Sequence, residues 1–155
     1  MDQRAHAASL TSMGVCVGEV MNRLVSAVNA HDLEAAAALF DADYRSSQPV
    51  HPGRTFIGRE QMRANWAAMF AGIPDFHAEL VRSVDDGQFT WSEWHWSGTR
   101  TDGQPFEMRG VTLFEVADDV SMAGRLYLED VERDVIGIDE VVETLSGHRP
   151  HTVGP

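Results

Sequence analysis

Several features are scarce in this sequence of 155 residues, and each scarcity excludes a class of protein. The single cysteine, Cys16, cannot form a disulfide within the chain. Free thiols are typical of reducing compartments, so we expect a cytoplasmic protein. No segment approaches the roughly 18 consecutive apolar residues of a membrane-spanning helix, so no membrane association is expected.

Positive charge is also scarce, because the formal net charge is −12 and lysine is absent. Nucleic acids and anionic membranes demand cationic surfaces, so neither is expected as a partner. All the cations are arginines, whose planar guanidinium groups suit carboxylates and cannot form a Schiff base.

Sequence motifs for metals and nucleotide cofactors are missing. The seven histidines and the cysteine show no paired spacing of the H-x3-H or C-x2-C kind. No phosphate loop, dinucleotide fingerprint or nucleophile elbow is present. We therefore expect no metal and no other cofactor.

Periodicity predicts three helices in the first half of the chain. Apolar residues spaced i, i+3, i+4 indicate a helix over 17–28, and Asp32 is placed to cap a short helix over 33–40. A short strand over 41–49 and a loop over 50–58 should lead to a third helix over 59–71.

After Pro74 the period changes to 2, which predicts strands over 76–84, 88–99, 106–116 and 120–132. Short turns join them into an antiparallel meander, and a short helix is expected over 137–147. The fold class is therefore α+β: three N-terminal helices packed on a strongly curved antiparallel sheet, a cone-shaped arrangement with room for a cavity. We expect a flexible leader over 1–16, which lacks the apolar core of a secretion signal, a single domain over 17–146 and a flexible tail over 147–155.

The stretch "WSEWHWSGTR" holds three of the four tryptophans. Alternation along a strand places Trp94 and Trp96 on one face, and Trp91, Glu93 and His95 on the other. Whichever face lies inward decides whether the interior is apolar or carries acid–base groups.

The order of elements, together with "GREQMRANWAAMF", "PDF", "WHWSGTRTDG", "RGVTLFEV" and "GRLYLEDVE", resembles the nuclear-transport-factor-2-like superfamily. Within it the sequence is most similar to the SnoaL-like branch, which includes polyketide cyclases and the related limonene-epoxide hydrolases. The resemblance covers roughly 17–132 and implies a cone-shaped cavity between helices and sheet.

The resemblance also implies where catalytic groups would lie. The Arg–Asp pair of the epoxide hydrolases falls on Trp94 and Trp96, and the last-strand Asp of both enzyme types falls on Leu126. The His of the cyclases falls near Thr112. The chain thus lacks these enzymes' catalytic groups at every matched position.

Neighbouring strands indicate which face is buried. The face shared with Trp94 and Trp96 is almost wholly apolar, whereas the opposite face would desolvate several Glu and Arg side chains at a cost of several kcal/mol for each unpaired charge. We therefore predict that the tryptophans face the helices. The outer face, with aromatic, Arg and Glu side chains, suits a homodimer interface.

Two sets of polar residues are candidates for chemistry. His51, in the loop expected at the cavity mouth, suits a general base or acid, and Tyr44 on the first strand could assist it. A solvent-exposed loop histidine and a locally hydrogen-bonded tyrosine are the alternatives. The second set is an acid–base or purely structural network of Glu93, His95, Arg109, Tyr127 and Glu129.

Two hypotheses follow for function. The first is a small-molecule enzyme of SnoaL-like type, a cyclase, isomerase or hydrolase, acting by acid–base chemistry on a hydrophobic, cyclic metabolite. The second is a small-ligand-binding or dimerisation module without a reaction, which the missing family acids favour. The residues predicted to contact the ligand are Gln48, Trp66, Met69, Trp94, Trp96, Met108, Thr112, Leu126 and Leu128.

Overall fold

The computed structural model of the chain describes residues 17–150. Its helices and strands follow in the order α1 (Val17–Asn29), α2 (Leu33–Ala38), β1 (Phe40–Ser47), β2 (Phe56–Ile57), α3 (Arg59–Gly72), β3 (His77–Asp86), β4 (Phe89–Thr99), β5 (Pro105–Ala117), β6 (Val120–Asp130) and α4 (Ile138–Ser146). A single 3₁₀ turn, Pro52–Arg54, lies between β1 and β2. The predicted leader, and residues 151–155 of the predicted tail, lie outside the described residues.

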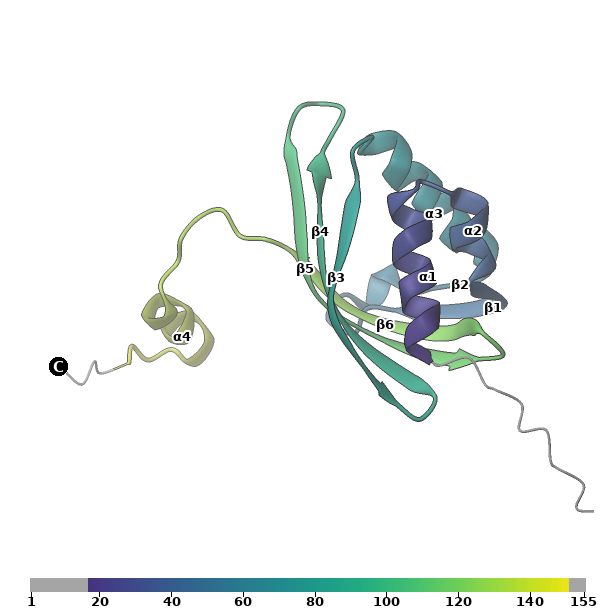
Figure 1. Cartoon of the computed structure of the whole chain (residues 1–155). Helices are drawn as coiled ribbons and strands as arrows, with labels where there is room; N and C mark the ends of the chain where they lie inside the picture. Colours follow the sequence, from purple (N-terminus) through teal and green to yellow (C-terminus); the bar gives the residue numbers. More distant parts are fainter. Residues whose placement is uncertain (1–16, 151–155) are drawn as a thin grey trace, which may run out of the picture.

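The strands form one curved, unclosed sheet in the order β2-β1-β6-β5-β4-β3. Strands β3 to β6 are the predicted antiparallel meander, and β1 joins it parallel to β6. Helices α1, α2 and α3 cover one face of this sheet (Figure 1). The predicted α+β class is confirmed.

The helix layer is attached to the sheet by an apolar stripe and by one polar clamp. The stripe of α1 is buried as its spacing predicts, and it consists of Val20, Met21, Leu24, Ala27 and Val28. At the end of α1, the Asn29 side chain donates to the Ala78 carbonyl oxygen at 2.8 Å and accepts from the Ala78 N–H at 2.7 Å. This pair of hydrogen bonds satisfies backbone groups of the edge strand β3.

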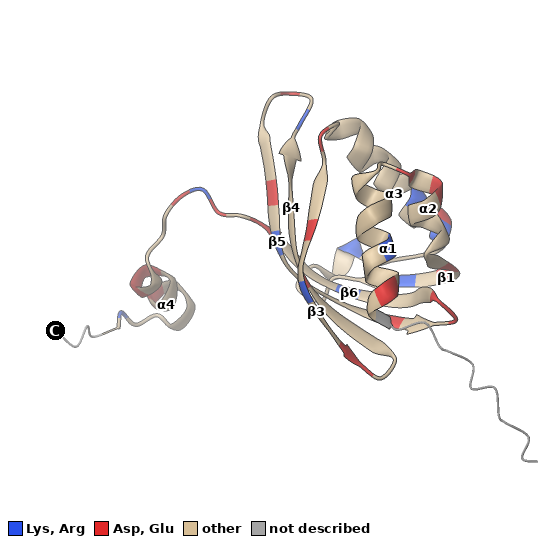
Figure 2. Ribbon diagram, in the orientation of Figure 1, with Lys and Arg blue, Asp and Glu red and all other residues tan. Residues whose placement is uncertain are grey.

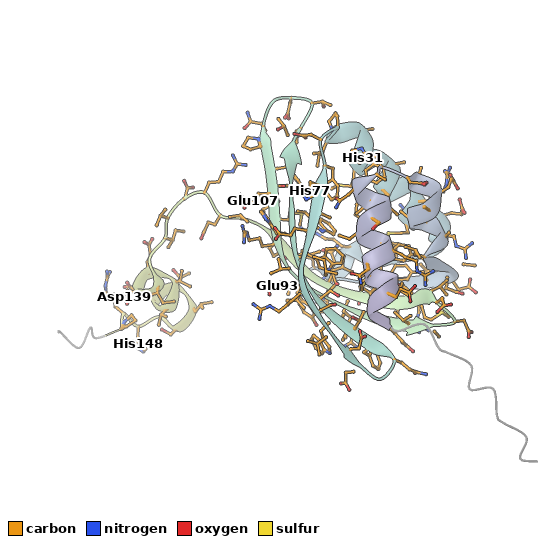
Figure 3. The ribbon with its side chains drawn as sticks, in the orientation of Figure 1. His31, His77, Glu93, Glu107, Asp139 and His148 are labelled. Atoms are coloured by element: carbon orange, nitrogen blue, oxygen red, sulfur yellow. The ribbon has the colours of Figure 1, made fainter. Side chains whose placement is uncertain are left out.

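Strand β4 has the predicted parity. Trp94 is 3% exposed beneath the helices, whereas Trp91 on the opposite face is 47% exposed. The register of β4 against β5 runs without interruption from Phe89 to Thr99, so no bulge inverts the faces there. Glu93 and Glu107 point away from the helices (Figure 3).

The structure departs from the predicted elements at several places. The second helix ends at Ala38, because Phe40 already starts β1. The predicted loop before α3 contains the two-residue strand β2, which pairs with β1. In β6 a bulge at Met122 interrupts the alternation, so Ser121 is fully buried there and Met122 only half-buried.

Helix α4 stands apart from the rest of the chain, on the side of the sheet opposite the other helices (Figure 1). None of its residues is buried. Across residues 17–150, the structure contains no helix with the length and apolarity needed to cross a membrane.

Candidate functional site

A cavity of about 270 Å³ lies between the sheet and the helices. Its lining comes from α1, β1, α3 and the inner face of the meander, as the cone-shaped arrangement predicts. The lining residues are Leu24, Val28, Phe40, Ser46, Gln48, Phe56, Met62, Asn65, Trp66, Met69, Ala78, Trp94, Trp96, Phe106, Met108, Thr112, Phe114 and Leu126.

Aromatic rings form one wall of this cavity. Trp66 of α3 and Trp96 of β4 have ring centroids 5.6 Å apart, and Phe76 contacts both at 5.6 and 5.7 Å with nearly perpendicular rings. Such edge-to-face contacts add about 0.5–1.5 kcal/mol per pair beyond area burial. The two indole rings therefore offer flat apolar surfaces to a ligand.

One buried hydrogen bond fixes the floor of the cavity. The Trp94 indole N–H donates to the Thr112 hydroxyl oxygen at 2.8 Å, from β4 to the neighbouring strand β5. Because that oxygen accepts the indole proton, the hydroxyl's own proton is directed elsewhere. Thr112 therefore retains one donor for another acceptor.

The described residues that line the cavity include no Asp, Glu, His, Arg, Cys or Tyr. Their polar groups are the hydroxyls of Ser46 and Thr112, the amides of Gln48 and Asn65, and the indole N–H groups. None of these groups exchanges a proton readily near neutral pH. The lining suits binding and offers no general acid or base.

Tyr44 lies behind the lining, at the bottom of the core. Its side chain is fully buried, and its hydroxyl makes no hydrogen bond to a residue within 17–150. Burial raises the pKa of Tyr44 well above its usual value, and the nearby Ser46 hydroxyl offsets only part of that effect. Gly124 makes room for this ring, since a Cβ there would collide with the Tyr44 hydroxyl and with Phe114.

His51 lies outside the lining and contacts a carboxylate on the surface. Its Nε2 is 2.7 Å from Glu129 Oε1, and both side chains are substantially exposed. The backbone N–H of His51 donates to the carbonyl oxygen of Gln48 at 2.8 Å. His51 therefore lies three residues along the chain from Gln48, which lines the cavity. The structure thus joins the first catalytic candidate to a member of the second network.

The second network is divided into separate contacts on the outer face. His95 Nε2 is 2.9 Å from Glu107 Oε1, and its Nδ1 is 3.5 Å from Glu79 Oε2. Arg109 contacts the same Glu107 carboxylate at 3.4 Å. Glu93 pairs instead with Arg82 at 2.7 Å. Tyr127 is half-exposed and makes no side-chain hydrogen bond to any described residue.

Eight of the nine residues predicted to contact a ligand line the cavity, and Leu128 is buried elsewhere in the core. Their contact with a ligand stays a prediction. Asn65, Ser46 and Ala78 were not predicted as lining residues. Asn65 follows Met62 by three positions and precedes Met69 by four, so the helical stripe itself could have indicated it.

Comparisons with known proteins identify the family. A family model described as a SnoaL-like domain matches residues 21–121. The match covers well over half of the chain, so the protein belongs to the SnoaL-like family. No curated protein matches the sequence.

Solved structures share the fold at low sequence identity. Wild-type IdmH of Streptomyces antibioticus, thought to be a polyketide cyclase, superposes with a TM-score of 0.63 at 22% identity, covering 75% of this chain and 92% of that one. A protein of Jannaschia sp. CCS1, thought to be a SnoaL-like polyketide cyclase, gives 0.63 at 21% identity and covers 73% and 85%. A Catenulispora acidiphila protein with a ketosteroid isomerase-like fold, solved with trimethylamine, gives 0.61 at 20% identity and covers 80% and 89%. Family and fold together place the chain among SnoaL-type small-molecule enzymes or binders.

Proposed function

We propose that the protein binds a small, mostly apolar ring compound in the inner cavity and that the described lining residues perform no proton transfer on it. The observation that carries this proposal is the lining itself, which is aromatic and aliphatic and includes no ionisable side chain among the described residues. In other proteins, a dry apolar cavity of about 150 Å³ already holds benzene. A cavity of about 270 Å³ therefore suits a ligand of about two fused rings.

The ligand should carry a hydrogen-bond acceptor. Thr112 has a hydroxyl proton that the Trp94 contact does not use. An acceptor oxygen on the ligand would meet this donor in a place without bulk water, where a hydrogen bond is strong and an unpaired polar group costly. A ketone or phenol of one or two rings fits this description.

Calorimetric titration with naphthalene-sized probes, 2-naphthol and 1-tetralone, tests the proposal. The variant Leu126→Trp fills the cavity from the inner face and should abolish the heat of binding. Tyr127→Trp is its matched control, because it adds the same side chain at the next residue, on the exposed outer face. Circular dichroism establishes that both variants are folded.

Binding of these probes by wild type and Tyr127→Trp, and not by Leu126→Trp, would support the proposal. A wild type that binds none of the probes, or a folded Leu126→Trp that still binds them, would refute it. Native mass spectrometry of protein purified from its source cell would identify what occupies the cavity.

Catalysis is the second candidate function, and the contact between His51 and Glu129 favours it. A carboxylate 2.7 Å from one imidazole nitrogen orients the ring and leaves the other nitrogen available to exchange a proton with a substrate. His51 would then act on a substrate bound near Gln48, with Tyr44 buried behind the cavity lining. Once a substrate is known, unchanged turnover in a His51→Ala, Tyr44→Phe double variant would exclude this function.

We also propose that two copies associate through the outer face of the sheet. That face exposes Trp91 and Tyr127 beside the ion pairs of Glu93, His95 and Arg109. Exposed aromatic side chains surrounded by paired charges are typical of an interface centre with a polar rim. A monomer at micromolar concentration, by light scattering, would contradict this association.

A further inference from the structure

Helix α4 carries an apolar face that no other part of residues 17–150 buries. Ile138, Val141, Val142 and Leu145 follow the spacing of one helix face, and Leu145 is 82% exposed. The other faces carry Asp139, Glu140 and Glu143, so the helix is strongly amphipathic and acidic (Figure 2). A helix of this kind is stabilised mainly by burial of its apolar face against a partner surface.

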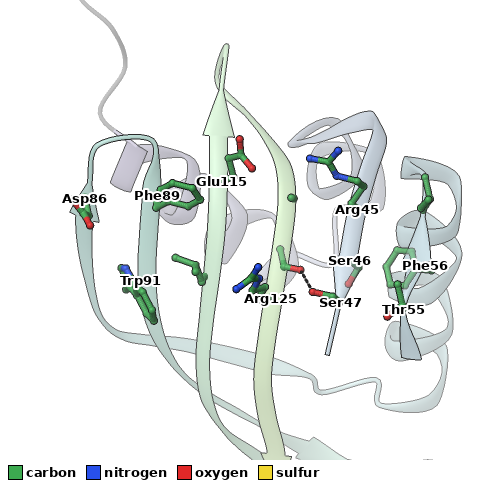
Figure 4. A pocket seen from close by; sticks show the side chains of 14 residues that line it. Arg45, Ser46, Ser47, Thr55, Phe56, Asp86, Phe89, Trp91, Glu115 and Arg125 are labelled. Atoms are coloured by element: carbon green, nitrogen blue, oxygen red, sulfur yellow. Dashed lines mark hydrogen bonds between the residues drawn. The ribbon is translucent and has the colours of Figure 1, made fainter. Parts of the chain in front are cut away.

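The outer face of the sheet has a groove with the matching character. It has a volume of about 650 Å³ and crosses β4, β5, β6 and β1 at the end of the sheet where β4 begins (Figure 4). Phe89, Trp91 and Leu113 form its apolar part, and Phe89 and Trp91 are 41% and 47% exposed. The groove therefore exposes apolar side chains that a partner surface could cover.

The charges of the groove are ordered across the strands. Arg45 of β1 and Arg125 of β6 lie on one side, and neither makes an ion pair with any described residue. Glu115 of β5 and Asp86 of β3 lie on the other side. The two arginines complement the acidic faces of α4. The opposite side of the groove complements Arg149, which follows the helix and contacts Glu143 at 3.2 Å.

The chain that leads to α4 starts at the opposite end of β5 from the groove. The Val131 N–H donates to the Glu107 carbonyl oxygen at 3.0 Å, and the Arg133 guanidinium donates to the Pro105 carbonyl oxygen at 2.6 Å. The backbone is held at Val131 beside Glu107, six residues and about 20 Å along β5 from Leu113, where the groove begins. The seven steps from Val131 to Ile138 span at most about 25 Å, so α4 reaches its own groove only when this linker is almost fully extended.

With a less extended linker, α4 would begin over the middle of the sheet. Its nine residues extend about 13 Å further, so Ile138 and Val141 would then lie over the charged contacts of Arg109, and only the last turn would approach Leu113. That position buries apolar side chains against charges and leaves most of the groove open. The α4 helix of a second molecule is not limited by the length of this linker.

We propose that α4 of one copy binds in the outer-face groove of a second copy, with Leu145 packed against Trp91 and Leu113. The exchange is reciprocal if the two copies are related by a two-fold axis, because each then supplies one helix and one groove. This inference rests on the association through the outer face proposed above, and it specifies the segment that completes that interface.

Sedimentation velocity on three full-length variants tests the proposal. Leu145→Asp places a charge on the apolar face of α4 and should weaken dimerisation by about tenfold or more. Thr144→Asp adds the same charge at the next residue, outside that face, and should leave dimerisation as in wild type. Leu113→Asp, a change on the exposed side of the sheet, should weaken dimerisation as Leu145→Asp does.

A mixture of two variants distinguishes exchange between copies from binding within one chain. The Leu145→Asp chain retains an intact groove, and the Leu113→Asp chain retains an intact α4. In a mixed dimer, the intact α4 of the Leu113→Asp chain can bind the intact groove of the Leu145→Asp chain. An equal mixture of the two variants should therefore dimerise more tightly than either variant alone. Acrylamide quenching of tryptophan fluorescence should fall in the mixture as the Trp91 side chain is covered.

Two results would overturn the proposal. If Leu145→Asp dimerises as wild type does, α4 makes no contact at the interface, even where the dimer itself persists. If the mixture behaves as the average of its components, no helix is exchanged. Binding of 2-naphthol in the inner cavity should remain unchanged in all these variants, so a failure here is distinct from a failure of the proposed ligand site.

Discussion

At the scale of single residues, the Thr112 hydroxyl stabilises the fold because it accepts the buried Trp94 indole proton. We expect Thr112→Val to lower the free energy of unfolding by about 1–3 kcal/mol, since it keeps the shape of the side chain and leaves the indole without an acceptor. Urea unfolding followed by circular dichroism measures this change. In a Trp94→Phe background the same substitution should cost much less, because no donor is left unpaired. Equal costs in both backgrounds would contradict the role given to this hydrogen bond.

Tyr44 makes stability depend on pH in the alkaline range. Burial raises its pKa, so the folded protein holds the phenol neutral where the unfolded chain already ionises it, above pH about 10. Stability from this residue is therefore fully present below pH about 10 and is lost as the pH rises further. Urea unfolding at several pH values should show a steeper alkaline loss for wild type than for Tyr44→Phe. Parallel profiles of the two proteins would show that Tyr44 does not titrate on unfolding.

At the scale of elements, β5 and β6 approach closely at Gly110. Its φ is +156°, and a Cβ there would collide with the Tyr127 carbonyl oxygen and the backbone of Leu128. We expect Gly110→Ala to destabilise the fold by more than about 2 kcal/mol, because the strands must separate to admit the methyl group. Gly137→Ala is the matched control, since nothing lies within 4 Å of a Cβ there. Thermal unfolding of both variants checks the difference, and similar melting temperatures would contradict it.

The periodicity of apolar residues predicted most of these helices and strands. It failed where contacts between residues distant in sequence determine the structure. Alternation placed Trp94 inward because every second residue of β4 is apolar or small, and the uninterrupted pairing with β5 preserves that parity. The bulge at Met122 and the short strand β2 depend on pairing with strands remote in sequence, which periodicity does not report. His51 was expected at the cavity mouth only because it lies in a loop. The residue that contacts it, Glu129, is 78 residues away in the chain, so periodicity does not report this contact.

At the scale of the whole molecule, the two faces of the sheet carry different kinds of side chain. The inner face and the helices enclose an apolar cavity, and the ionisable groups considered for catalysis lie on the outer face or, like Tyr44, behind the cavity lining. A net charge of −12 makes copies of the chain repel one another at long range, so association requires local pairs of opposite charge. The arginines of the outer face supply those pairs.

Arg109 is the central test of that arrangement, because it lies beside Glu107 and His95 in the middle of the outer face. Arg109→Glu would place another carboxylate among those of Glu79 and Glu107, and across a two-fold axis the repulsion would be doubled. We expect the dissociation constant of the dimer, measured by sedimentation equilibrium, to rise by about tenfold or more. Arg23→Glu on the exposed side of α1 changes the net charge from −12 to −14 in the same way, and it should leave the constant nearly unchanged. If both variants weaken association equally, long-range repulsion alone would account for the effect. The middle of the sheet would then not be the interface.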